Sequence, residues 1–101
     1  MTEITDTTFE AEVINSDQTV VVDFYSPECR PCQMVDKVLH EVKEQVDENV
    51  KIVKVNIYNS PASASRFSIM SVPTVISFKK GRITGHLTGA RKVADYIALT
   101  K

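Results

Sequence analysis

A strand, a helix and a second strand follow one another between residues 19 and 57, and this unit restricts the fold more than any other part of the chain. Thr19 to Tyr25, TVVVDFY, is a β-branched and aromatic run, typical of a central strand buried on both faces. Val50 to Ile57, VKIVKVNI, predicts a second strand. The unit therefore predicts a right-handed crossover and parallel pairing. The intervening helix is indicated by apolar residues at steps of three and four, namely Met34, Val35, Val38, Leu39, Val42 and Val46.

Shorter elements are expected on either side of this unit. Their signals are capping residues, turn residues and short apolar runs. No internal repeat or linker interrupts them. In chain order they are a strand at Thr2–Ile4, a helix from about Thr7 to Asn15 with Asp6 as N-cap, a helix at Pro61–Phe67, a hairpin of Thr74–Lys79 and Arg82–Thr88, and a helix at Arg91–Leu99.

The composition is that of an ordinary globular protein. The chain has 101 residues, 43% of them hydrophobic and 25% charged, and its formal net charge is −1. These values disfavour disorder and offer no basic surface to a nucleic acid. The first residues, MTEITDTTFEAEV, carry acids where a signal peptide has Lys or Arg, and no apolar run approaches a membrane span of about 18 residues. We expect a single α/β domain, residues 1–101, in the cytoplasm, with no membrane or nucleic-acid partner.

Two cysteines, in the stretch SPECRPC, stand where the first long strand ends and the helix begins. The N–H groups of a first helical turn are unpaired and the helix dipole is positive there, which favours a thiolate at Cys29. Cys32, one turn further on, lies at disulfide distance and can resolve it. Pro31 is tolerated in that first turn. A disulfide between the cysteines would add only about 2 kcal/mol of stability. Stabilisation of the fold is therefore a weak explanation for this cysteine pair.

Inert thiols and half of a zinc site are the alternatives for this cysteine pair. A zinc site needs two further ligands. The two histidines, His40 and His86, fall at no recognised ligand spacing. We therefore expect no metal, and a redox-active dithiol is the preferred interpretation.

Asp23 is the only charged residue in its strand. The apolar residues on both sides of it indicate burial, which raises the pKa of a carboxyl group and allows it to exchange protons near neutral pH. The alternative is a carboxyl group that is partly exposed near the strand end. For Lys54, an ordinary lysine of a half-exposed strand is as good an interpretation as a functional one.

Together these motifs resemble the thioredoxin family over nearly the whole chain. VVDFYSPECRPCQM is similar to the family's active-site segment, and VKIVKVNI, SVPTVISFKKG and LTGA follow in the family's order. The resemblance implies the thioredoxin fold, in which helices cover both faces of a central mixed β-sheet. It also implies a protein disulfide oxidoreductase that acts by thiol-disulfide exchange.

The resemblance further implies a role for each residue of the redox centre. Cys29 matches the exposed nucleophile and Cys32 the buried resolving cysteine, and the two form the redox disulfide. Asp23 matches the buried acid that relays protons to the resolving thiol, and Lys54 matches its ammonium partner. Pro31 matches the proline between the cysteines, which helps to tune the redox potential.

A substrate-docking surface is implied in the same way. Val72, Pro73 and Thr74 match a loop whose proline is cis and whose preceding backbone pairs with an extended client segment. Gly89 matches a small residue that flanks the docking groove, and Glu28 lies where client proteins dock.

The resemblance implies no bound cofactor. Electrons would come from NADPH through a flavin-dependent thioredoxin reductase, and the other partners would be client proteins that contain disulfides. A monomer is the default for a small domain. Two alternatives stay open: a binding module on the same fold, and a dedicated oxidant or reductant with a single client.

The chain departs from the family at five positions. Glu28 and Tyr25 stand where tryptophan is usual, Arg30 where glycine is usual, Tyr58 where an acid is usual, and Lys37 where a proline kinks the helix. A guanidinium beside a thiolate raises the reduction potential, whereas a carboxylate lowers it. Arg30 lies on the helix turn between the sulfurs and Glu28 on a loop, so we expect a protein somewhat more oxidising than family members with glycine there.

Overall fold

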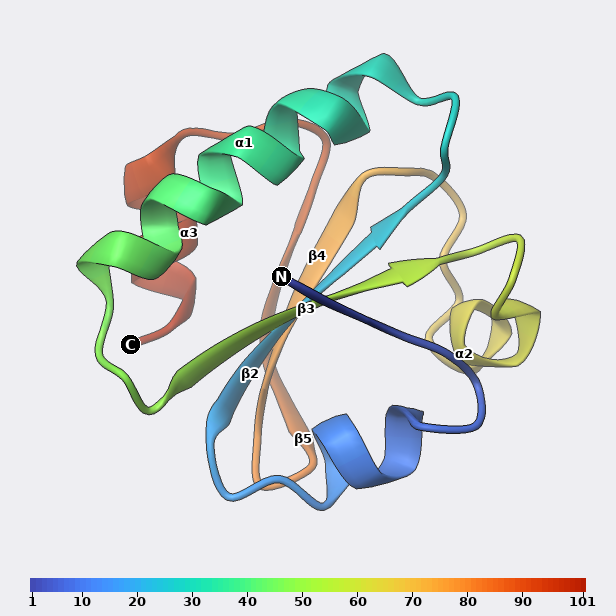
Figure 1. Cartoon of the computed structure of the whole chain (residues 1–101), viewed down its shortest axis with the longest axis horizontal. Coiled ribbons are helices and arrows are strands. Elements are labelled where there is room, and N and C mark those ends of the chain that lie inside the picture. The colour runs from blue at the N-terminus through green and yellow to red at the C-terminus, as the bar shows by residue number, and fades with distance from the viewer.

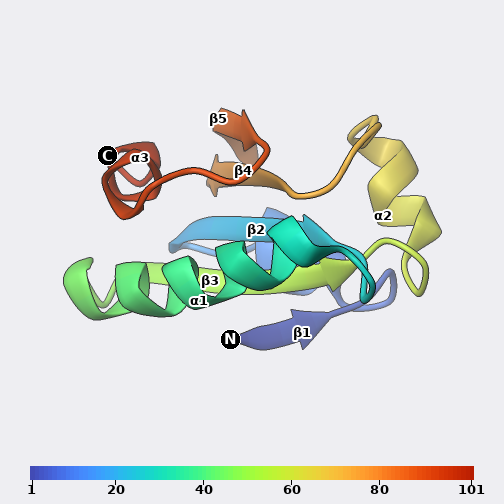
Figure 2. The same cartoon turned by 90° about the horizontal axis from the view of Figure 1, so that it is seen from above.

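Five strands form one mixed sheet in the order β1-β3-β2-β4-β5, which can be followed from one edge to the other in Figure 2. The computed structural model describes all residues, 1–101. Strands β1, β3 and β2 pair in parallel, whereas β4 runs antiparallel to both β2 and β5. The predicted parallel pairing is thus confirmed. The strands are β1 (Thr2–Ile4), β2 (Thr19–Tyr25), β3 (Val50–Asn56), β4 (Thr74–Lys79) and β5 (Arg82–Thr88).

The central strand β2 directs alternate side chains to opposite faces of the sheet, as strand geometry requires. Val20, Val22 and Phe24 belong to one apolar cluster, and Val21 belongs to the other. Asp23 alternates with them and so shares the face of Val21. A charged group is thereby placed on a face that is otherwise apolar.

Helices α1 (Arg30–Gln45) and α3 (Val93–Leu99) cover the face that carries Val21. Figure 1 shows them together on one side of the strands. Val35, Leu39 and Val42 of α1 are fully buried against this face, together with Tyr96 of α3. The apolar stripe predicted for the helix is therefore the stripe that packs.

The opposite face is covered by η1, a π-helical segment at Glu10–Ile14, and by α2 (Pro61–Arg66). Four phenylalanines make the centre of this layer, with neighbouring ring centroids 5.3 to 6.4 Å apart. Two of these rings come from the sheet and two from the segments outside it, so they bind the layer to the sheet. They are Phe9, Phe24, Phe67 and Phe78.

The predicted helix at Thr7–Asn15, capped by Asp6, is wrong in its start and its cap. The helical segment begins at Glu10 and has no side-chain cap. Threonine hydroxyls hold the preceding residues in a turn, with the Thr5 N–H donating to Thr8 Oγ1 at 3.0 Å. The Asp6 carboxylate instead accepts three hydrogen bonds from the first turn of α2, 56 and 57 residues away.

Other element ends differ by one or two residues from the sequence expectation. Strand β3 ends at Asn56 and α2 at Arg66, each one residue early. Helix α3 begins at Val93 instead of Arg91, because Lys92 has extended backbone angles and donates its N–H to the Asp95 carboxylate at 3.1 Å. None of the helices has the length and apolar character needed to cross a membrane.

Candidate active site

The two cysteines are positioned by the junction between β2 and α1. Cys29 is the N-cap of α1, and its Sγ accepts the N–H of Cys32 at 3.1 Å. Pro31 lies in the first turn, where its missing N–H leaves no hydrogen bond unmade. The two residues form a disulfide with their Cα atoms 5.2 Å apart. The helix start therefore holds both sulfurs in reach of each other.

The two sulfurs differ in exposure. Cys29 is half-buried, whereas Cys32 is 3% exposed. Arg30 and Pro31, which separate them, are both exposed. A partner disulfide can therefore approach Cys29 from solvent, whereas Cys32 is screened by the protein.

Asp23 lies beneath the cysteines on β2 and is 1% exposed. Its Oδ1 atom is buried and has no hydrogen-bond partner. Burial is the main cause that raises the pKa of Asp23 from 3.8 to about 7; the charge of Asp36 raises it further, and that of Lys54 lowers it. A carboxyl group in this state takes up or releases a proton near neutral pH.

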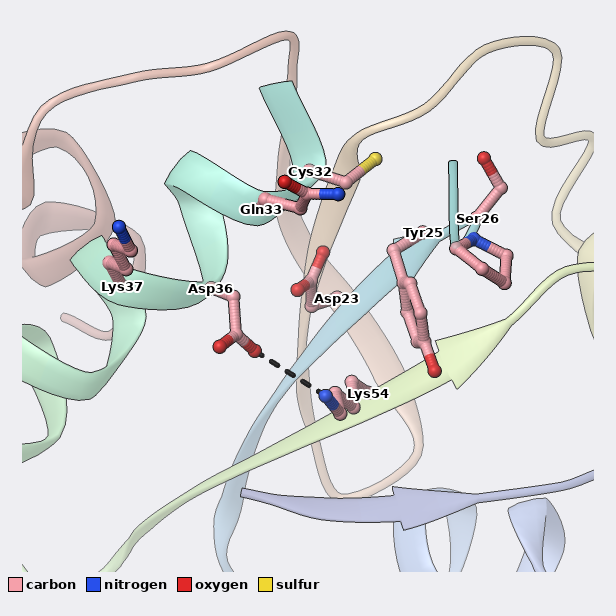
Figure 3. Close-up of a pocket in the computed structure, with 9 residues that line it drawn as sticks. Asp23, Tyr25, Ser26, Cys32, Gln33, Asp36, Lys37 and Lys54 are labelled. Atoms are coloured by element: carbon pink, nitrogen blue, oxygen red, sulfur yellow. Dashed lines mark ion pairs between the residues drawn. The ribbon is translucent and has the colours of Figure 1, made fainter. Parts of the chain in front are cut away.

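A cavity of about 270 Å³ connects Asp23 to Cys32 and to the charged side chains around them. Figure 3 shows Asp23 between the Cys32 sulfur and the pair formed by Asp36 and Lys54. Two carboxylates and two ammonium groups, from Asp23, Asp36, Lys37 and Lys54, are among its lining. The remaining lining residues are Tyr25, Ser26, Pro27 and Gln33.

Lys54 lies next to Asp23 in the register of β2 and β3, as the family resemblance implied, but no ion pair joins the two. Lys54 Nζ lies 3.5 Å from Asp36 Oδ1 and 5.1 Å from the centroid of the Tyr25 ring. The Tyr25 hydroxyl donates to Glu3 at 2.7 Å. The ring and the Asp36 carboxylate together hold the ammonium, whose charge still lowers the pKa of Asp23. The role of Lys54 as a partner of Asp23 stays a prediction, and the ion pair with Asp36 is a contact that the resemblance did not imply.

Asp36 is the site residue that sequence reasoning missed. It lies between the apolar positions of the helix, yet its Oδ1 atom is buried. The available signal was spacing, since a residue one turn after Cys32 lies on the same helix face. That signal does not reveal Lys54, which reaches Asp36 from another element.

A second loop reaches the same edge of the sheet. Phe24, near the end of β2, is in register with Thr74 at the start of β4. The Val72–Pro73 peptide bond is cis, the isomer that the resemblance implied, and Pro73 is buried. The Gly89 N–H donates to the Pro73 carbonyl at 2.9 Å, and Gly89 has a φ of +79°, which favours glycine. The predicted docking residues Pro73 and Gly89 are thus in direct contact.

Glu28 precedes Cys29 on the exposed loop after β2. The hydroxyl of Tyr58, an exposed side chain after β3, donates a hydrogen bond to its carboxylate. This bond is the main cause that raises the pKa of Tyr58. Two positions at which the chain departs from the family pattern are therefore paired with each other.

No group of three or more His, Cys, Asp or Glu side chains is arranged to hold a metal ion. His40 is exposed and its Nε2 lies 3.6 Å from Asp36 Oδ2. His86 is exposed on β5.

Comparison with known proteins places these residues in a family. The family model described as Thioredoxin matches residues 1–101. Thioredoxin 1 of Nostoc sp. is 43% identical over 88 residues, which cover 87% of this chain and 82% of the relative. Thioredoxin 1 of Synechococcus elongatus is 44% identical over 87 residues (86% and 81%), and the thioredoxin of Pyropia yezoensis is 39% identical over 90 residues (89% and 84%).

Proposed function

Since this chain belongs to the thioredoxin family and is a thioredoxin-like disulfide oxidoreductase, we propose that it reduces client disulfides with Cys29 as nucleophile and Cys32 as resolving thiol. One observation carries the assignment: Cys29 is half-buried at the start of α1, while Cys32, to which it is bonded, is buried above Asp23. Only one of the two sulfurs is open to a client.

The reaction runs in two exchange steps. The Cys29 thiolate attacks a client disulfide, the client S–S bond breaks, and a mixed disulfide forms as the first client sulfur leaves as a thiolate. The Cys32 thiolate then attacks the Cys29 sulfur and expels the second client sulfur. The client gains two electrons and two protons, and the Cys29–Cys32 disulfide remains.

Asp23 is the proton carrier for Cys32 in this proposal. Its carboxylate accepts the thiol proton and so produces the thiolate of the second step. Its pKa of about 7 supports the assignment, because both its protonation states are then populated near neutral pH. Their shared cavity supports it too, since both groups line it.

The client lies along Val72 in this proposal. Neither the N–H nor the carbonyl of Val72 takes part in a backbone hydrogen bond. Both groups are free to pair with an extended client segment, as in the addition of a strand to a sheet. Thr74 supports the loop, since its hydroxyl donates to the Ser71 carbonyl at 2.8 Å. Gly89 leaves the adjacent surface without a side chain, and Glu28 contributes a charge to it.

Arg30 sets the reduction potential above that of family members with glycine in its place. Its guanidinium follows Cys29 directly, whereas one oxygen of Glu28 is engaged by Tyr58, which supports the dominance of Arg30. Each unit by which the arginine lowers the pKa of the Cys29 thiol corresponds to an increase of about 30 mV in the reduction potential. Arg30→Gly should lower the potential measured against glutathione and Arg30→Lys should preserve it; an unchanged potential in Arg30→Gly would contradict this tuning.

The family works with thioredoxin reductase and with disulfide clients, and it needs no bound cofactor. For this chain we propose electrons from NADPH through a flavin-dependent thioredoxin reductase, a monomeric state and a cytoplasmic location. Relatives that are 39 to 43% identical to this chain carry the name thioredoxin, which supports a general reductase over a dedicated one.

The reduction of insulin disulfides by NADPH, thioredoxin reductase and this protein tests the proposal. We expect catalytic turnover by the wild type and none by Cys29→Ser. Cys32→Ser should accumulate a mixed disulfide between Cys29 and the client, which mass spectrometry detects. A wild type that shows no turnover of insulin disulfides would favour a binding module. Slow turnover together with rapid oxidation of client dithiols would favour a dedicated oxidant.

A further inference from the structure

Asp36 carries a carboxylate that the exchange steps do not use, although it lines the same cavity as Asp23. Its side chain is 34% exposed, but its Oδ1 atom is buried and lies 3.5 Å from the Lys54 ammonium. Asp23 Oδ1 is also buried and without a partner. Two carboxylates, one with an unpartnered oxygen and one paired with a lysine, therefore lie beside one another beneath Cys32 (Figure 3).

One lysine lies close to both of these carboxylates. Lys54 is in register with Asp23 on the neighbouring strand, and both side chains line the cavity. Its ammonium nevertheless pairs with Asp36, at 3.5 Å, and lies over the Tyr25 ring. Helix α1 thus supplies an acceptor that competes with Asp23 for the same lysine.

We propose that Asp36 is a positioning residue of the redox centre: it engages the Lys54 ammonium, withholds it from Asp23, and so keeps Asp23 outside any ion pair and able to exchange a proton with Cys32. The inference rests on the role proposed for Asp23. It assigns to α1 a second task besides that of holding the cysteines.

The electrostatics of the cavity agree with this arrangement. After burial, the negative charge of Asp36 is the next cause that raises the pKa of Asp23, and the positive charge of Lys54 opposes both. Asp36 acts twice, because it adds a like charge and also engages the opposite one. Removing it should let Lys54 pair with Asp23 and favour the ionised form of Asp23.

The other elements packed around Asp23 contribute few further titratable groups. Strand β4 presents Val75 to Asp23 and contributes none. His40 is the one imidazole in contact with Asp36. A His40→Gln variant therefore shows whether its charge contributes. The remaining groups are Cys32 and Lys37 of α1, Tyr25 of β2 with its partner Glu3 of β1, and Tyr96 of α3.

A pH titration of the Asp23 carboxyl carbon by NMR, in the oxidised protein, tests the inference. In Asp36→Asn we expect the midpoint to fall by about one pH unit, since an opposite charge becomes available and a like charge is lost. Asp36→Glu keeps the carboxylate and should stay near the wild type. Glu41→Gln, which removes an exposed charge from the same helix, is the matched control. An unshifted midpoint in Asp36→Asn would overturn the inference.

Lys54→Met provides a second arm. In the wild type it should raise the Asp23 midpoint modestly, because Lys54 is engaged by Asp36. In the Asp36→Asn background it should raise the midpoint more, because Lys54 then serves Asp23 directly. Equal shifts in the two backgrounds would mean that Asp36 does not withhold the lysine.

These titrations require no turnover, so they remain informative whatever the redox assays give. The pH profile of the second exchange step, measured as release of client from the mixed disulfide, links them to the reaction. We expect that profile to move with the Asp23 midpoint in Asp36→Asn. A shifted midpoint with an unmoved profile would overturn the proposed proton transfer by Asp23 and leave the electrostatic control by Asp36 standing.

Discussion

Asp6 and Asp23 carry the same carboxyl group, but the regions around them treat it in opposite ways. The half-buried Asp6 carboxylate accepts the N–H of Ala62 at 3.1 Å, the N–H of Ser63 at 2.8 Å and the Ser63 hydroxyl at 2.7 Å. The Ser63 hydroxyl is the main cause that lowers the pKa of Asp6. Asp23 is buried with an unpartnered oxygen, and its pKa is raised to about 7.

The difference teaches how one residue type serves structure in one place and chemistry in another. Hydrogen-bond donors stabilise the ionised form, so Asp6 stays charged and joins the N-terminal segment to α2. Burial without donors favours the neutral form, so Asp23 is left ready to change charge. The two groups also make the stability of the protein depend on pH with opposite sign.

The largest expected effect is a gain in stability from Asp23→Asn. The unfolded state ionises Asp23 at about pH 4 and the folded state at about pH 7, so the wild type loses stability as the pH rises between these values. At about 1.4 kcal/mol per pKa unit, the loss amounts to at most about 4 kcal/mol. Urea unfolding of the oxidised protein should give equal stabilities near pH 4 and a more stable variant at pH 8.

Asp17→Asn, at an exposed position, is the control for that experiment. If the free energies of unfolding of Asp23→Asn and the wild type differ by the same amount from pH 4 to pH 8, the raised pKa of Asp23 is contradicted.

Asp6→Ala should have the next largest effect, in the opposite direction. At pH 7 the variant loses a capping acceptor of three hydrogen bonds, so we expect the Tm to fall by a few degrees. Because the pKa of Asp6 is lowered in the folded state, its contribution is present above the unfolded value of about 4 and is lost as the pH falls below it. Thermal unfolding at pH 7 and at pH 3 measures the difference in Tm between the wild type and the variant. A difference as large at pH 3 as at pH 7 would contradict the role of the ionised Asp6 carboxylate as a cap.

Ser63→Ala should destabilise less, because the two backbone donors to Asp6 remain. Its clearer effect is on titration. The Ser63 hydroxyl is the main cause of the lowered pKa of Asp6, so that pKa should rise in the variant, as followed by NMR of the Asp6 carboxyl carbon. Ser65→Ala, at an exposed position of the same helix, should leave the titration of Asp6 in place.

Glu10→Gln should have the smallest effect. Arg66 Nη1 and Glu10 Oε1 lie 3.0 Å apart and join the same two segments as Asp6, but the side chains are 48% and 60% exposed. Exposed ion pairs contribute about 0 to 1 kcal/mol and are screened by salt. Urea unfolding at low and high salt should show a small loss that vanishes in high salt. A loss larger than that of Asp6→Ala would reverse the ranking of the two links.

The parts of the fold that followed from sequence are those in which local pattern and tertiary packing agree. The bounds of β2, β4 and β5 were predicted to the residue, because β-branched runs and a Lys-Gly turn leave few alternatives. The cysteines were placed correctly at the start of α1, since Pro31 and the strand before it mark that boundary. The mixed sheet with helices on both faces was also predicted correctly.

The Asp6 error arose because a side chain bonds to a distant partner instead of a near one. Asp6 precedes a helix-forming segment and has the local pattern of a cap, but the first turn of α2 offers it three donors across the fold. Asp36 was missed for a related reason, because its contact with Lys54 joins two elements that are separate in the sequence. Local sequence propensity does not indicate which hydrogen bond or ion pair a side chain forms when its possible partners come within reach only after folding.

The central position of β2 has a further consequence, for hydrogen exchange. Its peptide groups pair with β3 on one side and β4 on the other, so we expect its amide protons to exchange only when the whole sheet opens. Strand β1 pairs on one side over three residues, and its amides should exchange by local fraying. Asp23 therefore lies on the part of the protein that we expect to exchange most slowly.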